Sequence, residues 1–136
     1  CNDRGTILDD LIVYRAEVDA FLIVCNGSNR DKIAGVFAAG SAGRCDFADL
    51  TDQTALIAVQ GPKAAALLDL AGELGALRDG PAFRFADRTV LGVSCTVAKT
   101  GYTGEDGYEV FCPWDQAGQI WDGLLELGKS FGVAPC

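Results

Sequence analysis

The chain contains no histidine, and this absence removes several classes of chemistry. Without an imidazole, neither a Ser-His-Asp triad nor a Cys-His nucleophile pair can be built from this chain alone. No two cysteines have the CxxC spacing that marks the usual zinc sites, so we expect no metal. Proton transfer must therefore depend on aspartate, glutamate, lysine, tyrosine or water.

Positive charge is also scarce. The 11 lysines and arginines are outnumbered by 19 acidic residues, which gives a net charge of −8. Such a balance argues against a surface that follows nucleic-acid phosphates and against attraction to an anionic membrane. No apolar run approaches the ~18 residues of a membrane-spanning helix, and no signal peptide is visible. We therefore expect no nucleic-acid partner and no membrane partner.

The length of 136 residues and the hydrophobic content of 49% are sufficient for one packed domain, or for part of a larger one. The chain begins with Cys1 and ends shortly after an amphipathic helical pattern, so we expect an internal fragment of a longer protein. Of the six cysteines, Cys25, Cys95 and Cys112 lie in apolar, strand-like runs. Buried free thiols in an intracellular protein are favoured over disulfides.

Hydrophobic periodicity predicts an α+β fold, in which antiparallel strands form hairpins with about three helices packed on them. Strands are expected at 11–15, 20–25, 45–50, 54–60 and 108–113, and on both sides of a turn at Asp87–Arg88. Helices are expected after a cap at Ser28, with Asp31 in the place of a capping-box acid, after Pro62 and after Pro113. Each should bury one apolar face, formed in turn by Ile33, Val36 and Phe37, by Ala64, Leu67, Leu68 and Ala71, and by Ile120, Trp121, Leu124, Leu125 and Phe131. A sub-domain seam is placed near residues 40–48, around "SAGR".

Two adjacent carboxylates, Asp9 and Asp10, precede the first apolar strand in "GTILDDLIVY". Side chains alternate along an extended segment, so the two are expected to point to opposite faces. One of them could accept hydrogen bonds from an amine-rich heterocycle or lie near a developing cation. The alternative is an acidic turn with both side chains in solvent.

Three other stretches have weaker signals. Asn26 in "VCNGSNRDK" could present an amide to a ligand, or only complete a strand-to-helix turn. In "QGPKAA" a helix N-terminus could hold an anion, although a packing turn explains the same residues. Lys99 lies beside the glycine-rich segment, where a solvated lysine is the simpler interpretation.

The segment "TGYTGEDGYE" has glycines at every third position, which allows positive φ and close backbone approach. It matches neither the dinucleotide pattern GxGxxG nor a calcium loop. Tyr102 offers a flat ring for stacking, while Glu105, Asp106 and Glu109 could bind a cationic or donor-rich group. From the residues alone, a ligand-binding loop and a plain hairpin turn are equally supported.

Five stretches together resemble one family in order and spacing: "GTILDDLIVYR", "NGSNRDK", "ALIAVQGPKA", "KTGYTGEDGYEV" and "IWDGLLELG" followed by "GVAPC". They are similar to the glycine cleavage system T-protein, the aminomethyltransferase family. "TGYTGEDG" and "DDLIV" are the most specific of these motifs, and the resemblance covers nearly the whole chain. It implies that residues 1–136 form part of the folate-binding region of an aminomethyltransferase fold.

The resemblance also implies a reaction and a set of site residues. The family transfers a methylene unit from the aminomethyl-dihydrolipoyl arm of the H-protein to tetrahydrofolate and releases ammonia. Asp10 matches the catalytic aspartate of the family. Asn26, Tyr102 and Glu109 match residues that contact folate, and Tyr14 is expected to line the same cavity. The implied location is the cytoplasm of a bacterium or the mitochondrial matrix.

The chain also departs from the family pattern. Family members are more than twice as long, and Thr6 stands where a second glycine is usual. A non-catalytic folate-binding module and an inactive fragment of the same scaffold therefore remain as alternatives to an aminomethyltransferase.

Overall fold

The computed structural model describes all residues 1–136, and the chain divides into two units, Cys1–Asp49 and Leu50–Cys136. Each unit has its own antiparallel sheet. The division follows directly after residues 40–48, the range in which the sequence placed a seam. The predicted α+β class is confirmed, with four α-helices rather than three.

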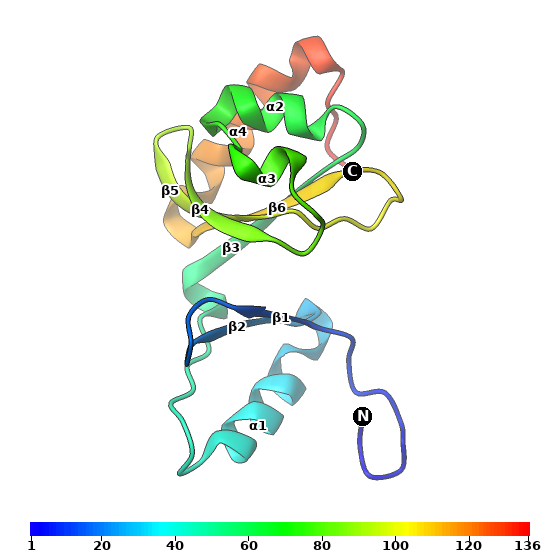
Figure 1. The fold of residues 1–136 in the computed structure, drawn as a ribbon, viewed down its shortest axis with the longest axis vertical. Helices are drawn as coiled ribbons and strands as arrows, with labels where there is room; N and C mark the ends of the chain where they lie inside the picture. Colours follow the sequence, from blue (N-terminus) through cyan, green and yellow to red (C-terminus); the bar gives the residue numbers. More distant parts are fainter. The chain divides into compact units, whose positions relative to one another are not determined.

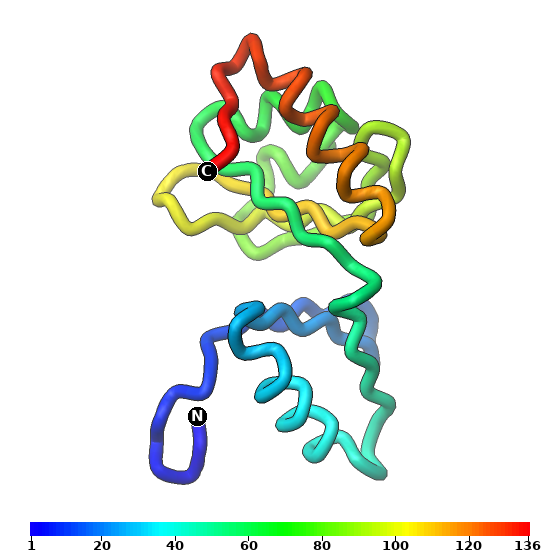
Figure 2. The backbone as a smooth tube through the Cα atoms, turned by 180° about the vertical axis from the view of Figure 1, so that it is seen from behind, coloured from blue at the N-terminus to red at the C-terminus, as the bar shows by residue number.

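The N-terminal unit consists of a hairpin and one helix. Strands β1 (Ile12–Arg15) and β2 (Phe21–Val24) pair antiparallel, as predicted, with Tyr14 opposite Leu22. A 3-10 turn then leads into α1 (Arg30–Ser41), which lies beneath the hairpin in Figures 1 and 2.

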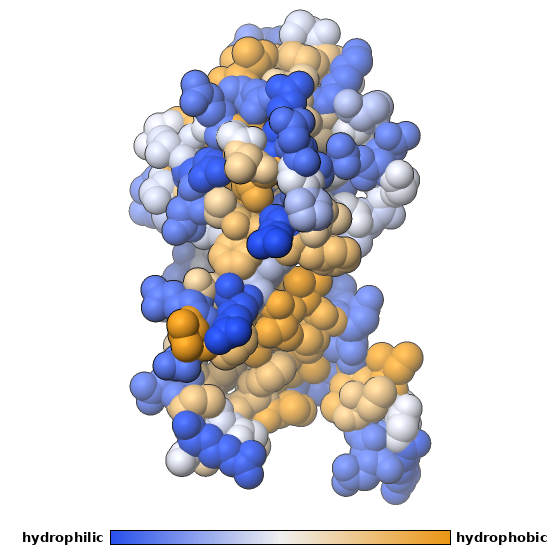
Figure 3. Space-filling model, in the orientation of Figure 1, coloured by the Kyte–Doolittle hydropathy of each residue, from blue (hydrophilic) through white to orange (hydrophobic).

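Several large apolar side chains remain exposed on the N-terminal unit. Figure 3 shows hydrophobic surface over the hairpin and along the helix of this unit. The exposed large apolar residues of this unit are Ile7, Val13, Val18, Phe21, Val36 and Phe47. Of the apolar stripe predicted for α1, only Ile33 is buried.

The prediction of a strand at residues 45–50 is wrong. This segment belongs to neither sheet, and its side chains are exposed. Its contacts are instead with α1, because Asp49 pairs with Arg30 at 3.1 Å and the ring of Phe47 stacks on Phe37 at 6.4 Å. The alternating apolar pattern thus reflects packing on a helix rather than pairing in a sheet.

The C-terminal unit is a four-stranded antiparallel sheet in the order β3-β6-β5-β4. Its strands are β3 (Thr54–Gln60), β4 (Phe85–Val90), β5 (Val93–Ala98) and β6 (Gly107–Pro113). Three helices lie on one side of this sheet (Figure 1), namely α2 (Ala64–Gly72), α3 (Ala76–Asp79) and α4 (Ala117–Gly128). None of the helices in the structure has the length and apolar content needed to cross a membrane.

The core of the C-terminal unit lies between the sheet and these helices. The stripe predicted for the helix after Pro62 is confirmed, because Ala64, Leu67, Leu68 and Ala71 of α2 are all buried. Alternate residues of β3 face the same core. On α4, Ile120 and Leu124 are buried, whereas Trp121, expected on the same side, is 42% exposed.

The turn predicted at Asp87–Arg88 is also wrong, because both residues lie within β4. The strands are instead joined at Leu91 and Gly92, which have φ of 51° and 83°. Positive φ at both positions matches the twist of a two-residue hairpin. A Cβ at Gly123 of α4 would lie 2.5 Å from Leu91 Cδ1, so this glycine makes room for the leucine. Packing thus holds leucine in a conformation that it rarely adopts.

Two of the six free cysteines, Cys95 and Cys112, are buried in this core. Burial, with a smaller contribution from Cys112, raises the pKa of the Cys95 thiol to about 11. Burial also raises the pKa of Cys112. Because the thiolate is the reactive form, we expect iodoacetamide to modify both residues at least about tenfold more slowly than exposed Cys45 at neutral pH.

Mass spectrometry of peptides from the labelled, folded chain measures these rates. Labelling in denaturant is the control, and all six cysteines are expected to react there at similar rates. Equal rates for Cys95 and Cys45 in the folded chain would contradict the buried position of Cys95.

Candidate functional site

The two adjacent aspartates converge on one asparagine. Asn26 Nδ2 donates to Asp9 Oδ1 at 2.7 Å and to Asp10 Oδ1 at 2.9 Å. The expectation that the two carboxylates point to opposite faces is therefore wrong. Strand β1 begins only at Ile12, so the alternation of a paired strand does not apply to residues 9 and 10.

Asp9 accepts more hydrogen bonds than its neighbour. Its carboxylate also takes the backbone N–H of Asn26 at 3.0 Å and Asn29 Nδ2 at 2.8 Å. The side-chain hydrogen bond from Asn26 is the main cause that holds the pKa of the Asp9 carboxyl below its ordinary value, against the opposing effect of desolvation. Asp9 is therefore ionised at neutral pH. We call Asp9, Asp10, Asn26 and Asn29 the aspartate–asparagine cluster.

The helix cap predicted at Ser28 is wrong. Asn29 is the residue before α1, and no side chain caps the helix. The Asn29 amide donates to Asp9 instead, and its oxygen accepts a hydrogen bond from Lys32 at 2.8 Å. Neither Ser28 nor Asp31 therefore acts as a cap, and the side chain of Asn29 before α1 belongs to the aspartate–asparagine cluster.

Asp10 keeps one oxygen of its carboxylate available. The side chain is exposed, and Oδ1 is the oxygen that accepts from Asn26. Because Oδ2 accepts no hydrogen bond, it is open to a donor or a cationic centre. Tyr14 follows on β1, opposite Leu22, with its side chain only 3% exposed.

In the C-terminal unit, a buried carboxylate stands at the end of the glycine-rich segment. Glu109 lies in β6 and is 1% exposed. Its Oε2 accepts a hydrogen bond from Thr100 Oγ1 at 2.5 Å, and its Oε1 accepts one from Tyr102 Oη at 2.6 Å. A carboxylate has about four acceptor positions, so each oxygen keeps acceptor capacity, but at 1% exposure a ligand reaches it only when a neighbouring side chain moves aside. We call Thr100, Tyr102 and Glu109 the Glu109 cluster.

The packing of Gln60 explains why two positions of the glycine-rich segment are glycine. The Gln60 carboxamide donates to the carbonyls of Thr100 and Tyr108, each at 3.3 Å. A Cβ at Gly107 would lie 1.8 Å from Gln60 Oε1, and one at Gly101 would lie 2.7 Å from it. The absence of side chains at these positions therefore makes room for Gln60. Gly104 differs, because no atom lies near its missing Cβ and its φ is +78°.

Lys99 is not the solvated lysine that the sequence suggested. The side chain is largely buried, and Nζ donates to the carbonyls of Arg78 at 2.8 Å and Gly80 at 3.0 Å. A carboxylate oxygen of Asp106 lies 3.9 Å away. Lys99 therefore ties the start of the glycine-rich segment to the end of α3.

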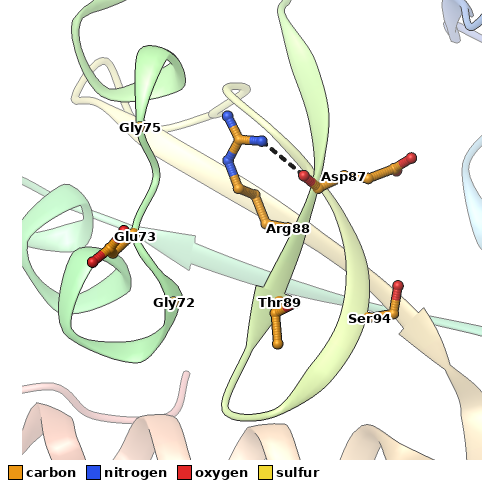
Figure 4. Close-up of a pocket in the computed structure, with 7 residues that line it drawn as sticks. All are labelled: Gly72, Glu73, Gly75, Asp87, Arg88, Thr89 and Ser94. Atoms are coloured by element: carbon orange, nitrogen blue, oxygen red, sulfur yellow. Dashed lines mark hydrogen bonds between the residues drawn. The ribbon is translucent and has the colours of Figure 1, made fainter.

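A polar hollow of about 530 Å³ opens elsewhere on the C-terminal unit, between the end of α2 and the β4–β5 hairpin. Figure 4 shows the Arg88 side chain extending from β4 toward the segment that contains Gly75. The guanidinium donates to the carbonyls of Leu74 at 3.0 Å and Asp87 at 2.7 Å. Arg88 thus connects two backbone segments, and none of the residues predicted for the site lines this hollow.

The structure places the predicted residues in two groups, one in each unit. Asp10 and Asn26 are hydrogen-bonded in the N-terminal unit, and Tyr102 and Glu109 are hydrogen-bonded in the C-terminal unit. Two further members of these clusters were not predicted, Asn29 and Thr100, and Asp9 was considered only as the alternative to Asp10 in the adjacent pair. Thr100 is the one that the sequence could have indicated, because a hairpin brings the residues that flank its loop together.

Comparison with known proteins gives consistent matches over the chain. The family model described as the GCVT N-terminal domain matches residues 1–136. Two proteins named aminomethyltransferase, from Bacillus subtilis and Halalkalibacterium halodurans, are each 38% identical to the chain over 139 and 137 residues. These alignments include 100% of the chain but only 38% and 37% of the relatives. The chain therefore spans well under half of their length.

A solved structure has the same fold. The heterotetrameric sarcosine oxidase from Corynebacterium sp. U-96, in complex with pyrrole 2-carboxylate, superposes with a TM-score of 0.71 at 18% sequence identity. The match covers 93% of this chain and 63% of that one. At this identity the similarity concerns the fold.

Proposed function

We propose that the complete protein acts in the glycine cleavage system, because the chain belongs to the GCVT N-terminal domain family and the relatives that it matches are named aminomethyltransferase. The proposed donor is the aminomethyl group on the dihydrolipoyl arm of the H-protein, and the acceptor is tetrahydrofolate. The methylene carbon becomes bonded to two folate nitrogens, and the carbon–sulfur and carbon–nitrogen bonds of the donor break. The products are methylenetetrahydrofolate, ammonia and the free dithiol arm.

The buried carboxylate of Glu109 is the observation on which this proposal rests. Two hydroxyl groups orient it, and both oxygens retain acceptor capacity. The pterin ring of tetrahydrofolate presents an amino group and a ring N–H side by side. A carboxylate accepts such a pair in a bidentate manner, which gives both affinity and orientation. In this proposal Tyr102 lies beside the bound ring.

Asp10 is proposed to act on the reacting centre. Its free Oδ2 offers a negative charge that stabilises the cation developing on the methylene carbon as ammonia leaves. Asn26 and Tyr14, which lie in the same unit as Asp10, are proposed to contact the folate. Catalysis would then depend on positioning and electrostatic stabilisation, without a covalent enzyme intermediate.

Calorimetric titration with 5-formyltetrahydrofolate tests the proposed acceptor site. Glu109→Gln replaces one acceptor oxygen by a donor, and we expect it to weaken binding about 30-fold, or about 2 kcal/mol. Glu126→Gln is the matched control, because Glu126 lies on α4 with its side chain 71% exposed. Equal affinity of Glu109→Gln and the wild-type chain would refute the proposed role of Glu109.

A second candidate function is a non-catalytic folate-binding module or an inactive fragment. A complete protein that binds reduced folate without transferring methylene would support the module, and absence of binding would support the inactive fragment.

The proposed transferase would work in the bacterial cytoplasm or the mitochondrial matrix.

A further inference from the structure

The amide of Asn26 has only one orientation compatible with its surroundings. Its nitrogen lies near three acceptors, with Asp10 O at 3.1 Å in addition to the carboxylate oxygens of Asp9 and Asp10. Both amide hydrogens are therefore engaged. Rotation of the amide by half a turn would place its carbonyl oxygen against two carboxylates, which is repulsive.

Asp9 contacts Asn26 at two points. Oδ2 accepts the backbone N–H of Asn26 at 3.0 Å, while Oδ1 accepts the side-chain nitrogen at 2.7 Å. A third hydrogen bond, from Asn29, holds the carboxylate itself in place. These two contacts fix the Asn26 side chain relative to its own backbone. Asp10 also accepts from the side-chain nitrogen, but it accepts no hydrogen bond from the backbone N–H of Asn26.

We propose that Asp9 is a positioning residue, which holds the Asn26 amide with its nitrogen toward the aspartates and its oxygen toward the ligand. This inference rests on the proposed function insofar as that ligand is a reduced folate. Asn26 then offers an acceptor and no donor. The chemical group that it receives is a hydrogen-bond donor, such as the ring N–H that 5-formyltetrahydrofolate retains and that folic acid replaces by a bare nitrogen.

The orientation of the amide can be measured without any ligand. In ¹H–¹⁵N spectra of the 136-residue chain, the Asn26 side-chain NH₂ signals are identified by their loss in Asn26→Asp. We expect them to be displaced from ordinary amide shifts and slow to exchange with solvent. In Asp9→Ala they should move toward the solvent-exposed values and exchange at least about tenfold faster.

Two further variants make this measurement decisive. Asp9→Asn keeps the shape of the side chain and one carbonyl acceptor, so it should give an intermediate effect even if Asp9→Ala unfolds the unit. Asp19→Ala, in the exposed β1–β2 turn, removes the same charge away from the cluster and should leave the signals unchanged. Unchanged Asn26 signals in both Asp9 variants would overturn the proposal.

Ligand preference tests the second part of the inference. Asp9→Ala removes the two-point contact and leaves the amide nitrogen held by Asp10 alone, so the amide can turn more readily and the preference for 5-formyltetrahydrofolate over folic acid should fall about tenfold. The same substitution should have no further effect in an Asn26→Ala background. An unchanged preference would overturn the assignment of the Asn26 oxygen to the ligand.

The two proposals fail in distinguishable ways. A wild-type chain that binds no reduced folate, also in the complete protein, would refute the proposed function and the ligand assignment. The spectra of Asn26 would then still decide whether Asp9 orients this amide.

Discussion

Replacing Asp10 with asparagine in the complete protein is expected to lower the turnover number for methylene transfer by about 10² to 10³-fold. The carboxylate of Asp10 supplies negative charge through an oxygen that accepts no other hydrogen bond. An amide of the same shape lacks this charge and therefore cannot stabilise the cation that develops on the transferred carbon. Because the proposed interaction is strongest in the transition state, the KM for tetrahydrofolate should change much less than the turnover number.

The matched control is Asp19→Asn, which removes one carboxylate from the same unit at an exposed position. Its turnover number should equal that of the wild type. Steady-state assays of methylenetetrahydrofolate formation, with circular dichroism to establish folding, measure both variants. A turnover number of Asp10→Asn within about threefold of the wild type would show that Asp10 does not act on the reacting centre.

The second large effect concerns stability. Gly72 ends α2 against β4, and a Cβ at this position would lie 2.1 Å from the backbone oxygen of Thr89. A backbone atom cannot move aside as a flexible side chain can, so helix and strand would have to separate. We expect Gly72→Ala to lower the free energy of unfolding of the C-terminal unit by about 3 kcal/mol.

Denaturant unfolding followed by tryptophan fluorescence measures this effect, because Trp114 and Trp121 both lie in the C-terminal unit. Gly118→Ala on α4 is the control, since no atom lies within 4 Å of its missing Cβ. This variant should gain about 0.5–1 kcal/mol from the higher helix propensity of alanine. A Gly72→Ala variant as stable as the wild type would be inconsistent with the close approach of α2 and β4.

The parts of the fold that the sequence predicts well have a strong local pattern. Strand β3 is found at the expected residues because it is a short continuous apolar run that ends at Gly61–Pro62. The apolar stripe of α2 likewise matches the helical period. In α2 the residues that form the helix also determine which face is buried, whereas in β3 apolar residues occupy both faces.

The misplaced β4–β5 turn has a non-local cause. Asp87 and Arg88 have the composition of a turn, but Asp87 accepts a hydrogen bond from Thr96 across the strands. Leu91 is not a turn residue by composition, and its contact with Gly123 depends on the packing of α4. A local sequence window around Leu91 does not contain Gly123, so propensity favours the wrong position.

For the candidate site, the residue types were predictable and their geometry was not. The aspartate pair and Asn26 are candidates because they flank apolar strands, and Glu109 because it ends an acidic, glycine-rich segment, but the family resemblance selects Asp10 and Glu109 among these acids. The convergence of Asp9 with Asp10 depends on where β1 begins, which is a property of strand pairing rather than of these residues. The orientation of the Asn26 amide follows only once both carboxylates are placed.

The position of Gln60 between two glycines limits the order in which this segment can evolve. Its carboxamide is held by two backbone carbonyls in the space that a side chain at Gly101 or Gly107 would need. A lineage can therefore replace either glycine most readily after position 60 has acquired a smaller residue. The reverse order passes through an intermediate with a steric clash. Whether a substitution in the glycine-rich segment is tolerated thus depends on the size of a residue more than 40 positions earlier in the chain.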